Sequence, residues 1–281
     1  MTLRLAYNTN GWPQHRLDDI VTILAEMGYA GVAITPDVFH LDPFDRATPG
    51  RAAELRRRLD DLNLAVAVET GARFVLDPRR KHQPTLLGEL PEATRRLDLL
   101  RRCLDLAVAL RAETFSFWSG AAPPGLDPDD LLARLCHGAN VVLDAAAESG
   151  VRVCFEPEPG MAVAGLEDLG DFLLALGRDD LWVMLDVGHV PVTESIGPDE
   201  AIVAFGERLG GVQLDDSQDG RHEHLFFGDG VIDFAAVARA LREVGYTGLA
   251  SVELPRHDHD PVSTARRALE FWRGLELSAR A

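Results

Sequence analysis

The sequence predicts an α/β fold, a single closed (β/α)8 barrel, from two observations. Short runs rich in β-branched and apolar residues recur along the 281 residues, and each is followed by a longer stretch with apolar residues at helical spacing. No change in composition and no Ser/Gly-rich linker interrupts this alternation. We therefore expect one TIM barrel over residues 1–281, with its active site at the C-terminal ends of the strands.

Eight runs qualify as strands of a parallel barrel. They are Leu3–Asn8, Gly31–Thr35, Ala65–Glu69, Thr114–Trp118, Val151–Glu156, Trp182–Asp186, Gly211–Leu214 and Ala250–Glu253. An open, doubly wound sheet is the alternative arrangement of such units. That fold usually carries a glycine-rich phosphate loop after its first strand, and "YNTNGWP" at this position contains neither GxGxxG nor a P-loop pattern.

The segments between these runs carry the signals of amphipathic helices. Pro128 and Pro198 each follow a residue suited to a helix start and precede an aspartate, which favours the first helical turn. Glycine follows the helical stretch in "EMGYAG", "ESGVR" and "EVGYTG", as is typical of helix ends. One apolar stripe, at i, i+3, i+4, i+7 and i+10, comprises Phe234, Val237, Ala238, Leu241 and Val244.

Composition restricts the classes of partner. The formal net charge is −17, so binding to nucleic acid or to an anionic membrane would need a strong basic patch. The chain has no apolar run long enough to span a bilayer and no basic start followed by an apolar stretch. Three cysteines without a CxxC pair argue against a disulfide framework and a zinc knuckle. We expect a cytoplasmic protein.

Oxygen-bearing side chains stand at the ends of the last four predicted strands. Because parallel strands of a barrel end on one rim, and side chains alternate along each strand, these four would point at a common axial position. The alternative is that each one separately caps a helix or meets water, but their succession in neighbouring units favours a shared site. They are Glu156, Asp186, Gln213 and Glu253.

Such a set predicts a divalent cation. Three crowded carboxylates would raise one another's pKa, and a bound cation keeps them ionised. An all-oxygen set suits Mn²⁺, Mg²⁺ or Co²⁺, and a nearby histidine leaves Zn²⁺ as an alternative. Of the two acids in "EPEP", Glu156 ends the strand, whereas Pro157 disrupts the ladder and moves Glu158 into the loop.

The motifs at these strand ends resemble those of the xylose isomerase-like TIM-barrel superfamily, in its sugar isomerase/epimerase and hydroxypyruvate isomerase-like branch. "CFEPEPG" holds the strand-five glutamate, and "LDVGH" holds an aspartate followed three positions later by His189. "QLDD" matches the glutamine variant of the strand-seven ligand, and "HLFFGDGVID" matches the family's return pattern HLxxGxGxID. The resemblance covers the whole chain in architecture, with the specific motifs in the second half.

The resemblance implies an activity and roles for individual residues. It implies a metal-dependent isomerase or epimerase, with Mn²⁺ as the first candidate, that moves a proton next to a ketone through an enediolate. Glu156 and Glu253 would be the acid/base pair and, with Asp186 and Gln213, would bind the metal. Candidate substrate contacts are His189, Arg221, His222, His224, Glu158, Glu69, Trp118 and Asn8.

Several of these residues have a second interpretation. Asn8 and Asn10 are equally well explained as turn formers, and Trp118 as core packing. The choice between His222 and His224 stays open, as does the alignment of Arg221, because the segment after strand seven is longer than in the simplest epimerases. That segment is expected to be a substrate-facing loop.

Other activities are compatible with the same residues. The same metal and bases could remove a β-hydroxyl from an inosose or a dehydroshikimate-like ketone, which would make the protein a lyase. A non-catalytic sugar-binding barrel is a further alternative. An endonuclease IV-like DNA-repair role is disfavoured by the charge and because early strand ends carry Glu69 and Trp118 instead of histidines. The expected partner is a sugar or a cyclic polyol ketone, with no nucleic acid and no membrane.

Two predicted connections are unusually long, Gly71–Leu90 and Pro157–Gly165. Such loops at the C-terminal rim shape a substrate site or meet another subunit, so a homo-oligomer is an open alternative. The first loop contains "DPRRKH", a basic island in an acidic chain. It is either an anion-binding segment or a solvated loop.

Overall fold

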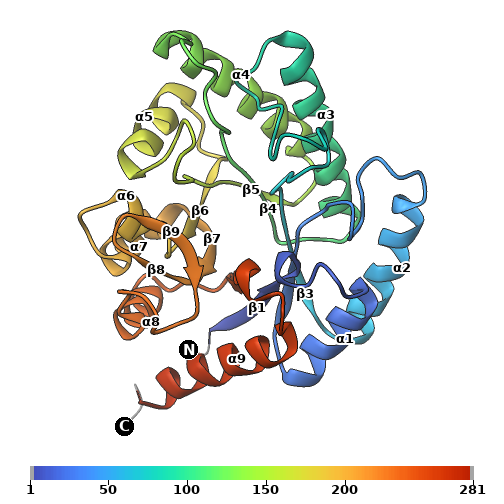
Figure 1. Cartoon of the computed structure of the whole chain (residues 1–281), viewed down its shortest axis with the longest axis vertical. Coiled ribbons are helices and arrows are strands. Elements are labelled where there is room, and N and C mark those ends of the chain that lie inside the picture. The colour runs from blue at the N-terminus through green and yellow to red at the C-terminus, as the bar shows by residue number, and fades with distance from the viewer. Residues whose placement is uncertain (1–2, 279–281) are drawn as a thin grey trace.

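Eight parallel strands close into a barrel within residues 3–278, the part of the chain that this computed structural model describes. Helices surround the barrel (Figure 1), so the predicted fold is confirmed. Around the barrel the strands are β1 (Arg4–Asn8), β10 (Leu249–Val252), β7 (Leu209–Leu214), β6 (Trp182–Asp186), β5 (Arg152–Phe155), β4 (Thr114–Phe117), β3 (Ala65–Glu69) and β2 (Gly31–Ile34).

The helices begin and end where the sequence signals predict. Pro128 and Pro198 open their helices, and the side chain of Asp127 accepts from the backbone N–H of Asp129 at 2.9 Å. Gly28 follows a helix with φ 93°, a left-handed conformation that glycine adopts without strain. The α-helices are α1 (Leu17–Met27), α2 (Thr48–Asp61), α3 (Leu90–Ala109), α4 (Pro128–Ala146), α5 (Leu166–Leu176), α6 (Val190–Thr193), α7 (Pro198–Phe205), α8 (Phe234–Glu243) and α9 (Pro261–Ser278).

Short 3₁₀ turns, η1 (Thr9–Gly11), η2 (Gly206–Arg208) and η3 (Pro255–His257), complete the described elements. None of the helices in residues 3–278 is long and apolar enough to cross a membrane. The apolar faces of the helices and the outer faces of the strands form the main core.

Small side chains from the first three strands fill part of the barrel interior. Ala6, Ala33 and Ala67 form a separate buried cluster with Leu249. Ala67 shares a strand face with Glu69, so this cluster forms the floor beneath the rim. Small residues at this level leave the acids above them room to approach one another.

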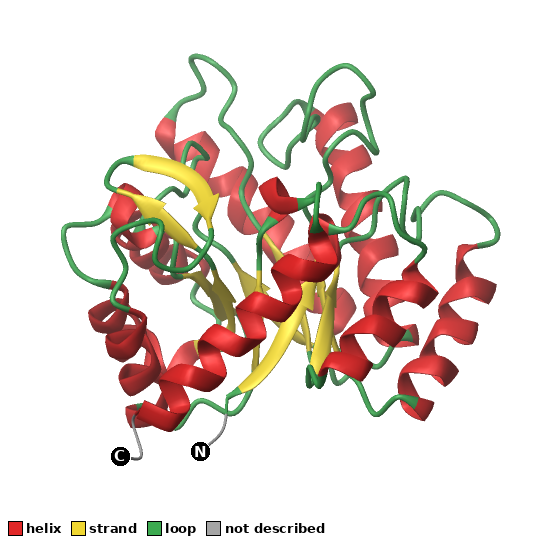
Figure 2. Cartoon of the chain, turned by 60° about the horizontal axis from the view of Figure 1, so that its bottom comes forward, coloured by secondary structure: helices red, strands yellow, loops and turns green. Residues whose placement is uncertain are grey.

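A two-stranded antiparallel hairpin follows β7, where the sequence predicted a loop. It consists of β8 (Asp216–Gln218) and β9 (Arg221–Leu225), joined by the two-residue turn Asp219-Gly220. Figure 2 shows the hairpin and the long loops at one end of the barrel, away from the start of β1. The segment predicted as a substrate-facing loop is therefore a hairpin, and "DG" between extended runs is its signal in the sequence.

Candidate active site at the C-terminal rim

A cavity of about 580 Å³ opens at the C-terminal ends of the strands. Its walls come from strand ends, from the long loop after β3 and from the hairpin. The residues predicted for the site that line it are Glu69, Trp118, Glu156, Glu158, His189, Gln213, His222, His224 and Glu253. Residues 3–278 thus place nine of the predicted residues around one space.

Gln213 lies at the centre of the polar floor. Its side-chain amide nitrogen donates to Glu69 Oε2 at 2.6 Å and also to Glu253 Oε2. Because carboxylates only accept, these two contacts fix the orientation of the amide and direct Gln213 Oε1 away from them. Glu253 receives a further hydrogen bond from the Asn10 side chain, at 2.6 Å to Oε1.

Several buried oxygens here have no hydrogen-bond partner among the described residues. They are Gln213 Oε1, Glu69 Oε1 and Asp186 Oδ2. A buried acceptor without a donor is destabilising, and a cation is a natural partner for an amide oxygen beside carboxylates. The oxygens therefore fit a divalent metal, and hard cations such as Mn²⁺ or Mg²⁺ prefer such donors.

The buried acids strongly disfavour being ionised together. Burial, and then the carboxylate of Glu253, raises the pKa of Glu69 well above its usual range. Burial, and then the neighbouring Glu158 and Glu253, does the same to the pKa of Glu156. Burial also raises the pKa of Glu253. A positive charge at this position would let these groups ionise near neutral pH.

Asp186 lies beneath the cavity and is held by its own loop. Its Oδ1 accepts from the backbone N–H of Gly188 at 2.8 Å, and its Oδ2 lies 3.3 Å from His189 Nε2. Burial alone would raise the pKa of Asp186, but His189 and His224 outweigh it and lower that pKa. A Cβ at Gly188 would lie 1.8 Å from Asp215 Oδ1, so "DVGH" needs glycine for this close approach.

Asp216 anchors the segment that returns from the hairpin to the barrel. Its Oδ2 accepts from the backbone N–H groups of Gly228 and Gly230 at 2.8 and 2.9 Å, and its Oδ1 from Ile232 at 3.2 Å. A Cβ at Gly230 would lie 2.2 Å from Asp216 Oδ1, so no larger residue fits there. These hydrogen bonds join the last aspartate of "QLDD" to the backbone of "GDGVID", so the two motifs form one structural unit.

Three groups of described side chains offer metal-ligand atoms within 4.8 Å of one another. Glu156 and Asp186 belong to different groups. Glu253 belongs to none of the three and is hydrogen-bonded to Gln213. The predicted four-residue ligand set is therefore brought to one rim but is not drawn together as a single tight cluster. The groups are His189 with His222 and His224, Glu156 with Glu158 and His189, and Asp186 with Asp215 and His224.

Two predicted substrate contacts lie elsewhere. Arg221 is exposed, pairs with Gln218 beside the hairpin turn and does not line the cavity, because side chains alternate and His222 occupies the inward position. Asn8 is buried behind the wall, where its Oδ1 accepts from Thr35 Oγ1 and from the backbone of Asn10, each at 2.9 Å. Asn8 is therefore a turn former, as its second interpretation proposed.

Asn10, for which the sequence left open a polar contact or a turn, holds Glu253 by a side-chain hydrogen bond. Sequence reasoning missed Arg73 and Arg256, whose side chains line the wall of the cavity. Arg256 is tied to the hairpin, since it donates to the backbone oxygen of His222 at 3.0 Å. The proximity of "PRHDHDP" to the end of the last strand was the signal for Arg256.

Trp118 and Glu158 occupy the wall as predicted. The Trp118 ring packs under the Arg96 guanidinium, 4.7 Å from the ring centroid, and meets His82 edge-on. Glu158 is partly exposed, and its Oε2 lies 3.9 Å from His189 Nε2. Lys81 and His82 also line the cavity, so the basic island of the long loop stands at its mouth.

Together, the closed barrel and the polar rim define a (β/α)8 protein with a polar cavity at the C-terminal ends of its strands. The chain belongs to the family described as xylose isomerase-like TIM barrel, which it matches over residues 21–275. The resemblance inferred from the motifs is thereby confirmed.

Two groups of relatives are similar in sequence. Inosose dehydratase of Yersinia enterocolitica is 31% identical over 141 residues, which cover 43% of this chain and 46% of that protein. L-ribulose 3-epimerase of Methylomonas sp. is 28% identical over 163 residues, 56% of this chain and 54% of that protein. The aligned region thus spans about half the length of each of these relatives.

Solved structures show the same fold over nearly the whole chain. A structure of L-ribulose 3-epimerase matches with a TM-score of 0.79 at 20% identity, covering 99% of this chain and 96% of that one. D-allulose 3-epimerase from Methylomonas sp., in complex with D-allulose, gives a TM-score of 0.76 at 20% identity, with 97% of each chain covered.

Proposed function

We propose that this protein is a divalent-metal-dependent isomerase or epimerase of a ketose or a related polyol ketone. The observation that carries the proposal is the pairing of Glu156 and Glu253 across one cavity, with Gln213 and Glu69 bound beside Glu253. Relatives named as 3-epimerases and dehydratases support the same general chemistry.

Glu156, Asp186, Gln213 and Glu253 are the residues that would hold the metal, with Mn²⁺ as the first candidate. When bound, the metal would polarise adjacent carbonyl and hydroxyl oxygens of the substrate and so acidify the neighbouring C–H. Gln213 contributes its free amide oxygen to this set, because its nitrogen is already committed to two carboxylates.

The two glutamates would move the proton. One carboxylate removes a proton from the carbon next to the ketone, and the other returns a proton from the opposite side, which inverts or relocates the stereocentre through an enediolate. Burial raises the pKa of both glutamates in the metal-free protein, which favours the protonated form that a general acid needs. Asn10 orients Glu253 through its 2.6 Å hydrogen bond.

Dehydration of an inosose-like ketone is the second candidate function. The similarity to inosose dehydratases, at 31% identity over 141 residues, favours it. The same proton abstraction next to a ketone would begin this reaction, after which a β-hydroxyl leaves as water. Glu158 and His189 line the cavity and could protonate that leaving group.

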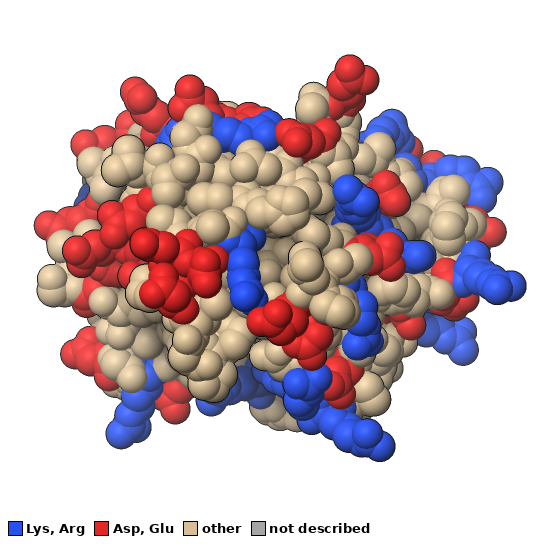
Figure 3. All heavy atoms as spheres, turned by 90° about the horizontal axis from the view of Figure 1, so that it is seen from above, with Lys and Arg blue, Asp and Glu red and all other residues tan. Residues whose placement is uncertain are grey.

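Surface charge argues against the DNA-repair alternative. Acidic side chains gather on one side of the face shown in Figure 3 and interrupt the basic ones elsewhere on that face. With a net charge of −17, this surface repels a phosphate backbone. A location in the cytoplasm and a sugar or cyclic polyol partner fit the proposed activity, and assembly of several copies remains compatible with it.

Product analysis in D₂O tests the proposal. The protein, loaded with Mn²⁺ or Co²⁺, is incubated with a panel of ketoses and inososes. We expect deuterium to enter the carbon next to the ketone, with mass otherwise conserved for an epimerase, and with loss of one water and a new conjugated chromophore for a dehydratase. Absence of exchange on the whole panel would refute both candidates.

Matched variants assign the exchange to the site. Glu253→Gln should abolish most of it, whereas Glu243→Gln makes the same chemical change on the exposed face of α8 and should leave the exchange rate unchanged.

A further inference from the structure

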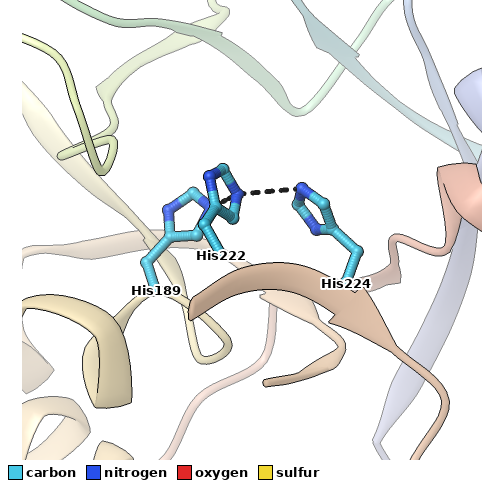
Figure 4. Close-up of side chains that lie close together, drawn as sticks. All are labelled: His189, His222 and His224. Atoms are coloured by element: carbon cyan, nitrogen blue, oxygen red, sulfur yellow. Dashed lines mark hydrogen bonds between the residues drawn. The ribbon is translucent and has the colours of Figure 1, made fainter. Parts of the chain in front are cut away.

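Three imidazole rings converge at the wall of the cavity, from two separate elements. His189 follows β6, and His222 and His224 lie two residues apart on β9, with their rings facing the same space (Figure 4). The Nε2 atoms of His189 and His222 are 3.0 Å apart, and those of His222 and His224 are 2.9 Å apart. All three residues line the cavity.

The other ring nitrogens are held by acceptors. His189 Nδ1 lies 3.2 Å from the backbone oxygen of Pro157, and His224 Nδ1 contacts the Asp215 carboxylate. A carbonyl and a carboxylate accept, so Nδ1 carries a hydrogen in each ring, and a metal would take the place of any second hydrogen at Nε2. His222 Nδ1 lies 4.0 Å from Glu158 Oε1, a separation that a water can bridge.

The three Nε2 atoms are placed to share one partner. His222 Nε2 carries either one hydrogen or one lone pair, and it is approached by Nε2 of both neighbours. When all three rings are neutral with the hydrogen on Nδ1, both contacts are pairs of facing lone pairs. A hydrogen on His189 Nε2 has Asp186 Oδ2 as an acceptor 3.3 Å away, whereas a cation between the rings accepts all three lone pairs at once.

The spacing matches a metal bound by imidazole. Zinc–nitrogen bonds of about 2.0–2.1 Å in a tetrahedral site put neighbouring ligand atoms about 3.3 Å apart. The observed separations of 3.0 and 2.9 Å need only a small outward movement of the rings. Metal-binding histidines typically donate their second nitrogen to a carbonyl or a carboxylate, which is what Pro157 and Asp215 provide.

Backbone conformation supports the same assignment. His224 has φ 48°, in the left-handed region that residues other than glycine seldom occupy. Strained backbone tends to persist where a functional geometry requires it. Here it turns the His224 ring toward His222 and its Nδ1 toward Asp215.

We infer that His189, His222 and His224 form a second divalent-cation site of the zinc type. It lies beside the oxygen set of Glu156, Asp186, Gln213 and Glu253 and adjoins it where His189 Nε2 lies 3.3 Å from Asp186 Oδ2. Three imidazoles select Zn²⁺ and similar borderline cations, whereas the oxygen set selects Mn²⁺ or Mg²⁺. Three histidine ligands leave a fourth position, which faces the cavity and is open to water or a substrate oxygen. The inference does not depend on the proposed reaction.

Equilibrium dialysis of metal-stripped protein against Zn²⁺, with Mn²⁺ present in excess to fill the oxygen site, tests the inference. The wild type should retain one equivalent of Zn²⁺ beside Mn²⁺. The double variant His222→Ala/His224→Ala should lose the Zn²⁺ and keep the Mn²⁺. His259→Ala removes an exposed histidine of the rim loop and should bind both metals as the wild type does.

A graded variant separates ligation from general damage. Asp215→Asn removes the carboxylate that orients His224 and should weaken Zn²⁺ binding about ten- to a hundred-fold. Mn²⁺ binding should weaken less, since Asp215 contacts only one residue of the oxygen set, Asp186. Equal weakening of both metals would count against a histidine site.

X-ray absorption spectroscopy of the zinc-loaded wild type decides the question even if the double variant fails to fold. Backscattering from about three imidazole rings supports the site. Zinc surrounded by oxygen only, or the same Zn²⁺ stoichiometry in wild type and double variant, overturns it and leaves a hydrogen-bonded histidine cluster. Neither outcome affects the deuterium-exchange test of the reaction.

Discussion

In the second half of the barrel, β5, β6, β7 and β10 each end on or next to an acid or an amide at the rim. In the first half only β3 ends on an acid that lines the cavity, Glu69, whereas β2 and β4 end on apolar residues and the Asn8 amide of β1 is buried behind the wall. Both halves have the same alternation of strand and helix, so the difference lies in what the strand ends carry. Residues of the first half hold those of the second half in place. The Asn10 side chain donates a hydrogen bond to Glu253, and Glu69 accepts one from Gln213. The second half supplies the groups suited to metal and proton chemistry.

This comparison teaches that a repeated scaffold does not require repeated chemistry. One half can supply the metal-binding side chains while the other half fixes their positions. This is possible because closing the barrel places β1 beside β10 and brings the N-terminal residues against the last strand.

The largest expected effect comes from substituting one acid in each half of the barrel and comparing the losses of activity. Glu253→Gln should lower the deuterium-exchange rate about 10²–10⁴-fold, the usual contribution of a positioned acid or base. Glu69→Gln should lower it only about tenfold, because its amide oxygen can still accept from Gln213. Exchange rates at saturating metal measure both variants. Equal losses would show that the first half takes part in the chemistry.

A smaller effect concerns stability against pH in the metal-free protein. The folded-state pKa values of Glu69, Glu156 and Glu253 lie above those of the unfolded chain, about 4.3. Their contribution to stability is therefore fully present below that pH and is lost as pH rises through the folded pKa values. Each group ionised only in the unfolded state contributes a slope of at most about 1.4 kcal/mol per pH unit.

Urea unfolding of the metal-free wild type and of Glu69→Gln between about pH 5 and pH 8 measures this loss. The variant should show a shallower decline, because it has one buried acid fewer, and added Mn²⁺ should flatten the curve of the wild type. Glu243→Gln, exposed on α8, should keep the slope of the wild type. A slope unchanged by Glu69→Gln would contradict the prediction.

The smallest expected effect concerns helix caps, which should stabilise the two halves of the barrel equally. Asp127 caps α4 through one backbone N–H, and Asp233 caps α8 through two, at 2.9 and 3.0 Å. Asp127→Ala and Asp233→Ala should each lower the free energy of unfolding by about 1 kcal/mol and leave exchange activity intact. Thermal or urea unfolding provides the measurement, and a selective loss of activity in either variant would argue against purely structural caps.

The sequence predicted the barrel, its strands within one or two residues and most of the residues of the cavity, because strand periodicity and a common rim are properties of the fold alone. Asp186 ends its strand as expected, Gln213 stands one residue before the end of its strand, and Glu156 and Glu253 follow theirs by one residue. Their hydrogen bonding was not predictable, since the contact from Asn10 to Glu253 joins residues 243 positions apart.

The hairpin was missed for a different reason. Its polar sequence lacks the apolar alternation by which strands are recognised, so the "DG" turn was the only short-range hairpin signal. Arg221 was consequently placed toward the substrate, and the convergence of His222 with His189 and His224 could not be foreseen.

The two-residue turn Asp219-Gly220 also decides which side chains the cavity receives. A slip of one position along the hairpin would turn every side chain of β9 to its opposite face. Two imidazoles would then give way to the guanidinium of Arg221 and the carboxylate of Glu223. The ion preference of this wall thus depends on the length of the turn that precedes β9, and a one-residue insertion or deletion there would exchange the side chains that face the cavity without substituting any residue of β9.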